Sequence, residues 1–102
     1  MIQALSDILV VSDVDNTLLT SAQGIPGCNI ETIKLFNSLG GRFTLATGRS
    51  MQSLKKYEND IELSAPAILY NGGVIYDYAD KKVVCFCALP HDEALRALHE
   101  IL

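Results

Sequence analysis

The segment that decides the fold reads Ile8-Leu9-Val10-Val11-Ser12-Asp13-Val14-Asp15-Asn16-Thr17-Leu18-Leu19. Residues 8–12 are apolar on both faces apart from Ser12, as in a strand buried within a parallel sheet. Asp13 and Asp15 then follow two residues apart, a spacing that puts both carboxylates on one face of an extended chain. One carboxylate could attack phosphorus while the other moves a proton. The alternative is an acidic turn without chemistry, since Asp-x-Asp-Asn is ordinary turn composition.

Downstream of this segment, the pattern alternates helices and strands. Strands are predicted over 42–46 and 67–70, and helices over 30–39 and 50–59. This β-α-β-α-β order requires right-handed crossovers and a parallel sheet with helices on its faces, so the fold class is α/β. A β-hairpin is predicted from 74–77 and 82–88 around a polar turn. Pro90 is expected to start a helix with Leu95, Leu98 and Ile101 or Leu102 on one stripe.

The predicted helix over 30–39 carries clear boundary signals. Asn29 can cap its N-terminus, and Gly40-Gly41 ends it. Cys28 is expected just before the helix start. The predicted buried face consists of Ile30, Ile33, Leu35, Phe36 and Leu39.

Composition limits the classes of protein to which the chain can belong. The 102 residues, 49% hydrophobic and 20% charged, can form one core but not two. The net charge of -4 argues against a nucleic-acid surface, which needs clustered Lys and Arg. The N-terminal apolar run is far too short to span a membrane, and no basic segment precedes it, so we expect a cytoplasmic protein. Cys28, Cys85 and Cys87 form neither a zinc-type pair nor a secreted disulfide framework, so reduced thiols are expected.

Distinctive polar groups follow each of the three predicted strands. They are Asp13 and Asp15, then Thr47-Gly48-Arg49, then Asn71-Gly72. Ligands of open parallel sheets collect at the carboxyl ends of the strands, so these groups are expected at one edge. Thr47 can donate a hydrogen bond to a phosphoryl oxygen, and the N–H groups of Gly48 and Arg49 lie near a helix start that favours anions. Each motif alone also fits a plain turn.

Together these motifs resemble the haloacid dehalogenase-like (HAD) hydrolase superfamily, and within it the Cof-type sugar-phosphatase branch. The resemblance covers the chain from Ile8 onward. In the first motif, Asn16 stands where Gly is commoner in this branch. The matching segments are Asp13-Val14-Asp15-Asn16-Thr17-Leu18, Ala46-Thr47-Gly48-Arg49-Ser50 and Asn71-Gly72-Gly73-Val74-Ile75-Tyr76-Asp77.

The resemblance implies a role for each site residue. Asp13 would be the nucleophile that forms an aspartyl-phosphate, and Asp15 the general acid and then base. Thr47 would hold the phosphoryl group. Mg²⁺ would be bound by the Asp13 carboxylate and the Asp15 main-chain carbonyl. Gly48, Arg49 and Asn71 would contact substrate, although Arg49 could equally pair with an acid on the surface.

The chain also departs from the family pattern. Members carry a phosphate-binding Lys and a Gly-Asp-x-x-x-Asp-type segment downstream, and neither is found after Asn71; Lys81 and Lys82 sit in the hairpin turn instead. We therefore expect a truncated, HAD-like (Rossmannoid) three-layer fold. Residues 1–89 would be the N-terminal part of the core domain, including the hairpin, and 90–102 the first helix of an incomplete cap domain.

Two functions remain open on this basis. The first is a Mg²⁺-dependent phosphomonoesterase that, in complete form, acts on a small sugar phosphate or similar metabolite. The second is a catalytically incomplete phosphate-binding or structural remnant of the fold. A signalling receiver is discounted, because its acceptor Asp would end the third strand, where Tyr70-Asn71 stands. The expected partner is a phosphorylated small molecule, without nucleic acid or membrane. Self-association is expected through the strand at 8–12, left as an edge, or through the terminal helix.

Overall fold

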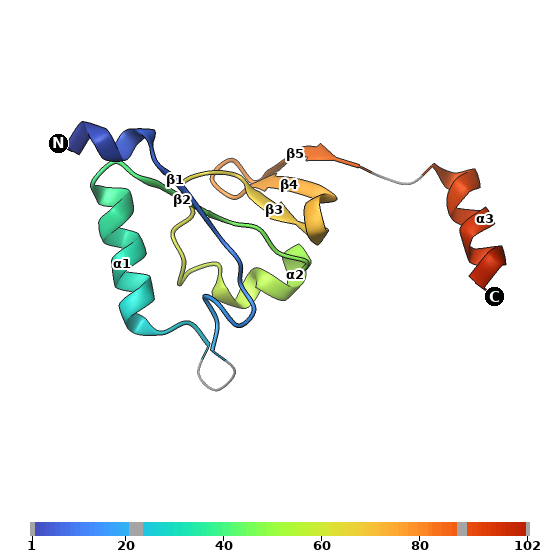
Figure 1. Ribbon diagram of the computed structural model, residues 1–102, viewed down its shortest axis with the longest axis horizontal. Helices are drawn as coiled ribbons and strands as arrows, with labels where there is room; N and C mark the ends of the chain where they lie inside the picture. The colour runs from blue at the N-terminus through green and yellow to red at the C-terminus, as the bar shows by residue number, and fades with distance from the viewer. Residues whose placement is uncertain (1, 21–23, 88–89, 102) are drawn as a thin grey trace.

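The computed structural model describes residues 2–20, 24–87 and 90–101 (Figure 1). Within these residues there are five strands, three α-helices and three 3₁₀ segments. In chain order the elements are η1 (Ile2–Asp7), β1 (Leu9–Ser12), α1 (Gly27–Ser38), β2 (Arg42–Leu45), α2 (Met51–Leu54), η2 (Lys55–Tyr57), β3 (Ala67–Leu69), η3 (Tyr70–Gly72), β4 (Val74–Asp77), β5 (Lys82–Phe86) and α3 (His91–Ile101).

The predicted α/β fold and the predicted hairpin are confirmed. Strand β1 runs parallel to β2, with Leu9 opposite Arg42 and Ser12 opposite Leu45. A parallel bridge between Ala46 and Ile68 connects the end of β2 to β3. Strands β4 and β5 pair antiparallel as the hairpin. The sequence pattern did not predict that β4 also pairs antiparallel with β3.

Strand β1 differs from its prediction in burial. Among the described residues it pairs with β2 alone, so its other edge is open. Without a neighbour there, its apolar side chains remain accessible: Leu9 is 53% exposed and Val10 is 40% exposed. The expectation of a strand buried within the sheet is therefore wrong for this chain, and the expected open edge is present.

Helix α1 begins earlier than predicted. Its first residue is Gly27, and Pro26, with φ of -59°, stands just before it. Proline has φ preset near the helical value and has no N–H to satisfy, so it suits a helix start. Asn29 consequently lies inside the helix instead of capping it, and Cys28 lies in the first turn. The helix ends at Ser38, two residues before Gly40, which has φ of 96°. The sequence Gly40-Gly41 predicted this end.

The buried face of α1 is narrower than the apolar residues suggest. Ile33 is buried, whereas Leu35 is 59% exposed, which corrects its assignment to the core. The second predicted helix is also shorter: α2 ends at Leu54 and continues only as the single turn η2. Ser50 begins α2 by accepting a hydrogen bond from the N–H of Ser53 at 3.1 Å.

The core lies between strands β2 and β3 and the segments that cover them. Leu45 and Leu69 are almost completely buried on adjacent strands, and Val14 is buried in the turn after β1. Burial of these side chains holds the carboxyl ends of the strands in place. The full buried apolar set is Val14, Leu18, Leu19, Ile33, Phe43, Leu45, Leu54, Ile61, Ala67 and Leu69.

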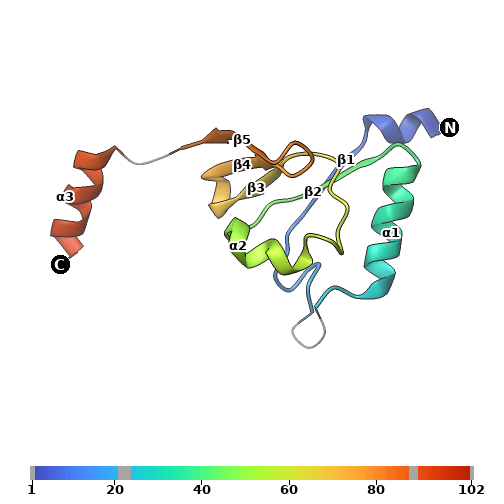
Figure 2. The same cartoon turned by 180° about the vertical axis from the view of Figure 1, so that it is seen from behind.

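Helix α3 extends away from the rest of the molecule in both views (Figures 1 and 2). Its stripe of Leu95, Leu98 and Ile101 is exposed, with Ile101 at 80%. Ala88, the last residue of the predicted hairpin, and Leu102, a residue of the predicted helix stripe, lie outside the described residues. No described helix is long and apolar enough to cross a membrane.

Candidate active site

The predicted nucleophile follows β1 directly. Asp13 is exposed, and its carboxylate accepts a hydrogen bond from the N–H of Val14 at 2.8 Å. The turn behind it is tight, because the N–H groups of Leu18 and Leu19 both donate to the Val14 carbonyl, at 3.1 and 2.8 Å. Asn16 in this turn has φ of 61°, in the left-handed region that asparagine and glycine tolerate best. This geometry explains why Asn can stand where Gly is commoner.

Thr47 is buried at the end of β2. Its N–H donates to the carbonyl of Ile68 at 2.9 Å, which holds it against the neighbouring strand. Its hydroxyl oxygen accepts a hydrogen bond from the N–H of Arg49 at 3.1 Å. A hydroxyl that accepts through oxygen can still donate its hydrogen. The Thr47 hydroxyl therefore still has a hydrogen to donate.

The Asn71 loop is joined to the Thr47 loop. The N–H of Asn71 donates to the Thr47 carbonyl at 3.0 Å, and the N–H of Tyr70 donates to the Arg49 carbonyl at 3.2 Å. Gly48 faces the Asn71 side chain, since a Cβ on Gly48 would lie 2.8 Å from Asn71 Oδ1. The structure therefore brings together Thr47, Gly48, Arg49 and Asn71, which the sequence placed on two separate strand ends.

Arg49 forms a forked ion pair with Asp15. Its Nη2 lies 2.7 Å from Asp15 Oδ1, and its Nε lies 3.2 and 3.1 Å from Oδ1 and Oδ2. These hydrogen bonds lower the pKa of Asp15 and raise that of Arg49. Of the two roles predicted for Arg49, the structure shows the ion pair with a surface acid.

Two further residues support Arg49, and sequence analysis had not singled them out. Ser53 Oγ accepts a hydrogen bond from Arg49 Nη1 at 3.0 Å. The Tyr57 ring centroid lies 5.9 Å from the guanidinium carbon of Arg49. The three-residue spacing of Ser50 and Ser53 at a helix start was the only signal for Ser53, and Tyr57 had none.

A polar cleft opens beside the Asp15–Arg49 pair. It has a volume of about 330 Å³ and is bordered by the turn after β1 on one side and the α2–η2 segment on the other. Asp13, Thr47 and Asn71 do not line it. The lining residues are Asp15, Asn16, Leu19, Thr20, Gly24, Arg49 and Tyr57.

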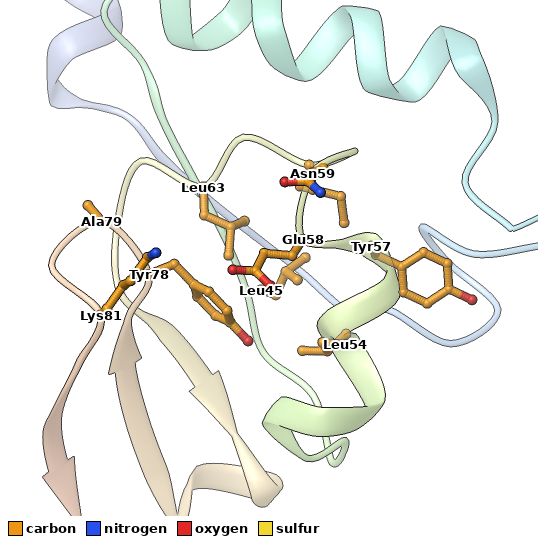
Figure 3. A pocket seen from close by; sticks show the side chains of 10 residues that line it. Leu45, Leu54, Tyr57, Glu58, Asn59, Leu63, Tyr78, Ala79 and Lys81 are labelled. Atoms are coloured by element: carbon orange, nitrogen blue, oxygen red, sulfur yellow. The ribbon is translucent and has the colours of Figure 1, made fainter.

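A second cleft of similar volume, about 330 Å³, lies between the α2–η2 segment and the hairpin turn (Figure 3). Its walls include Leu45, Leu54 and Leu63, with Tyr78 from the hairpin beside them. Tyr57 is the one residue that it shares with the polar cleft, and no predicted site residue lines it. We therefore place the candidate active site at the carboxyl edge of the strands.

Comparison with known proteins identifies the family of the chain. The profile of the haloacid dehalogenase-like hydrolases matches residues 10–102, which include all three motifs. The chain belongs to this hydrolase family. The match confirms the resemblance drawn from the sequence motifs.

The relatives of this HAD-like chain include phosphatases. Pyridoxal phosphate phosphatase YbhA of Escherichia coli is 29% identical over 90 residues, covering 88% of this chain and 33% of its own length. A haloacid dehalogenase-like hydrolase from Bacteroides thetaiotaomicron shares the fold with a TM-score of 0.77 and 31% identity, covering 91% of this chain and 36% of that one. The subclass IIB sugar phosphatase BT4131 matches with a TM-score of 0.68 and 25% identity, covering 92% and 37%. The HAD-like chain thus spans about a third of the length of these proteins.

Proposed function

We propose that this HAD-like chain carries the nucleophilic part of a Mg²⁺-dependent phosphomonoesterase. The observation that supports this most is the position of Asp13 and Thr47, which follow the paired parallel strands β1 and β2 at the same edge. A carboxylate and a hydroxyl donor at one sheet edge suit attack on a phosphoryl group and binding of its oxygens.

The proposed reaction has two steps. The Asp13 carboxylate attacks phosphorus, the bond to the leaving oxygen breaks, and Asp15 supplies the proton that this oxygen needs. Asp15 then takes a proton from water, which attacks phosphorus and releases inorganic phosphate from Asp13. Thr47 donates a hydrogen bond to a phosphoryl oxygen in both steps.

Magnesium would be held by the Asp13 carboxylate and the main-chain carbonyl of Asp15. Mg²⁺ takes oxygen ligands and commonly uses one or two carboxylates together with water and substrate phosphate, so this donor type fits. When bound, the ion neutralises charge on the transferring group. Among the described residues no three His, Cys, Asp or Glu side chains cluster as a metal site.

The proposed substrate is a small phosphomonoester such as a sugar phosphate. Support comes from the relatives named as a pyridoxal phosphate phosphatase and a sugar phosphatase, both of which act on phosphate esters of small molecules.

We also propose the domain division inferred from the sequence, with 1–89 in the core and 90–102 in a cap, and a cytoplasmic location. A second copy of the chain is the proposed partner for the open edge of β1.

A trapping experiment tests the nucleophile. Fluoroberyllate with Mg²⁺ mimics a phosphoryl group on a carboxylate, and bound fluoride is observed by ¹⁹F NMR. We expect a bound signal for the unmodified protein and none for Asp13→Asn. Asp80→Asn, which removes an exposed carboxylate in the hairpin turn, should keep the signal. A signal of equal size in Asp13→Asn would remove Asp13 as the nucleophile.

The alternative function is phosphate binding without turnover. It predicts the same site geometry. The two functions differ in the release of phosphate from a substrate, which is measured separately from trapping.

A further inference from the structure

We infer that Asp15 and the phosphate of a ligand compete for Arg49. The guanidinium that now pairs with Asp15 would be taken over by phosphate oxygens, and Asp15 would be released as the phosphate binds. This inference rests on the proposed function, because it assumes that phosphate enters this site.

The ion pair occupies much of the hydrogen-bonding capacity of Arg49. Nε and Nη2 both donate to the Asp15 carboxylate, while Nη1 donates to Ser53. The forked geometry that matches a carboxylate also matches two oxygens of a phosphate. The same donors can therefore serve either anion, but not both at once.

Asp15 can also be replaced easily as the partner of Arg49. The Asp15 side chain is 54% exposed and the Arg49 side chain 25% exposed. Ion pairs in contact with water contribute little to stability, because solvent screens them. Phosphate near neutral pH carries more charge than one carboxylate, so it is the stronger competitor for a guanidinium.

Exchange requires only a side-chain movement. The Arg49 backbone is held on both sides, since its N–H donates to Thr47 Oγ1 and its carbonyl accepts from Tyr70. Ser53 is fixed at the start of α2 by its bond to Ser50. The guanidinium can therefore move while the backbone of the site stays in place.

Space for the competing anion adjoins the pair. Asp15 and Arg49 both line the polar cleft of about 330 Å³, and Tyr57, whose ring lies beside the Arg49 guanidinium, lines it as well. A phosphate needs much less volume than this. Asp15 would then be released from Arg49 only once phosphate has bound in this cleft, which Asp13 and Thr47 do not line.

Orthophosphate binding to four proteins tests the competition: the unmodified chain, Asp15→Asn, Arg49→Gln and the double variant. Binding is followed at pH 7.5 by backbone ¹⁵N–H shifts in all four proteins, and the Arg49 Nε–H signal is an additional reporter in the two proteins that keep Arg49. We expect Arg49→Gln to weaken binding about tenfold or more, as for loss of a charge-assisted hydrogen bond. Asp15→Asn should tighten binding about two- to fivefold when Arg49 is present, and by less than about twofold in the Arg49→Gln background.

Two further variants separate competition from a general charge effect. Lys56→Gln removes the same unit charge near the same ring, since Lys56 Nζ lies 5.1 Å from the Tyr57 centroid. It should change phosphate affinity less than Arg49→Gln does. Arg49→Lys keeps the charge without the fork, so it should restore only part of the affinity.

The inference is overturned if Asp15→Asn changes affinity by the same factor in both backgrounds, because that result means through-space repulsion alone. It is equally overturned if Arg49→Gln leaves affinity unchanged, or if Lys56→Gln weakens binding as much as Arg49→Gln. Fluoroberyllate trapping at Asp13 is scored independently. Trapping with no coupling in this cycle would reject the competition and leave the proposed function standing.

Discussion

The N–H of Asn71 donates to the carbonyl of Thr47 at 3.0 Å, joining the loops that follow β3 and β2. Asn71 adopts φ of 55° and ψ of 35°, between Tyr70 and Gly72, which also have positive φ. Three consecutive left-handed residues let the chain reverse tightly enough to reach Thr47. The junction therefore depends on backbone conformation as well as on side chains.

Substitution of Asn71 separates these two contributions. Alanine tolerates the left-handed region poorly and glycine tolerates it well, so Asn71→Gly should be more stable than Asn71→Ala by about 1 kcal/mol. Urea unfolding measures the difference. Equal stabilities would mean that the backbone at residue 71 does not keep its positive φ in solution.

A side chain at Gly48 should destabilise the protein while Asn71 is present. We expect Gly48→Ala to lower the free energy of unfolding by about 1 kcal/mol, because its Cβ overlaps the Asn71 carboxamide. The cost should disappear in the Asn71→Gly background. Gly27→Ala at the start of α1 is the control: its Cβ would meet nothing within 4 Å, so stability should not fall. A cost of Gly48→Ala that persists without the carboxamide would place its cause elsewhere.

Tyr78 should make the protein less stable in alkali. Burial is the main cause that raises the pKa of Tyr78 above its ordinary value of 10.0, and the Glu58 charge adds to it. A raised folded-state pKa contributes stability that is fully present below pH 10 and is lost as the pH rises through the folded pKa. Tyr78→Phe should therefore flatten the fall in unfolding free energy above about pH 10.

At neutral pH the same substitution should cost little. The Tyr78 hydroxyl is buried and has no hydrogen-bond partner among the described residues, so its removal breaks no bond. Denaturant midpoints at pH 7 and above pH 10 test both points. An equally steep alkaline decline in Tyr78→Phe would assign the effect to another group.

Self-association should proceed through the open edge of β1. The Ile8 and Ser12 carbonyls accept from the N–H groups of Arg42 and Ala46, at 3.1 and 2.9 Å. Alternation along the strand therefore directs the backbone groups of Leu9 and Val11 outward. We expect concentration-dependent sedimentation that Val10→Lys suppresses, since a charge on an edge strand opposes pairing. Val84→Lys, on the exposed strand β5, should have the smaller effect. A monomer at all concentrations, or dissociation by Val84→Lys alone, would contradict this.

Turnover by these 102 residues should be very slow. The loss of one electrostatic group commonly lowers the catalytic rate about 10²- to 10³-fold. Neither the phosphate-binding Lys nor the further acids of the family pattern are found after Asn71 in these residues. With an aryl phosphate and Mg²⁺, we expect a rate at least about 10⁴-fold below that of full-length YbhA. A comparable rate that Asp13→Asn abolishes would show that the chain already holds a complete active site.

The sequence by itself determined the local structure. The apolar run before Asp13, the turn at Gly40-Gly41 and the polar break between β4 and β5 are short-range signals, and each predicted its element. The order of these elements then placed Asp13 and Thr47 at one sheet edge, because parallel strands end on the same side.

Only the tertiary structure decided which residues far apart in the sequence contact each other and which apolar side chains are buried. Arg49 and Asp15 are 34 residues apart, and no periodicity indicates which acid a surface arginine will meet. The exposure of Leu35 and of β1 likewise depends on what packs beside them, since an apolar side chain is buried only where another surface covers it. Sequence pattern therefore determined which groups reach the site, and packing determined which of them bind one another there.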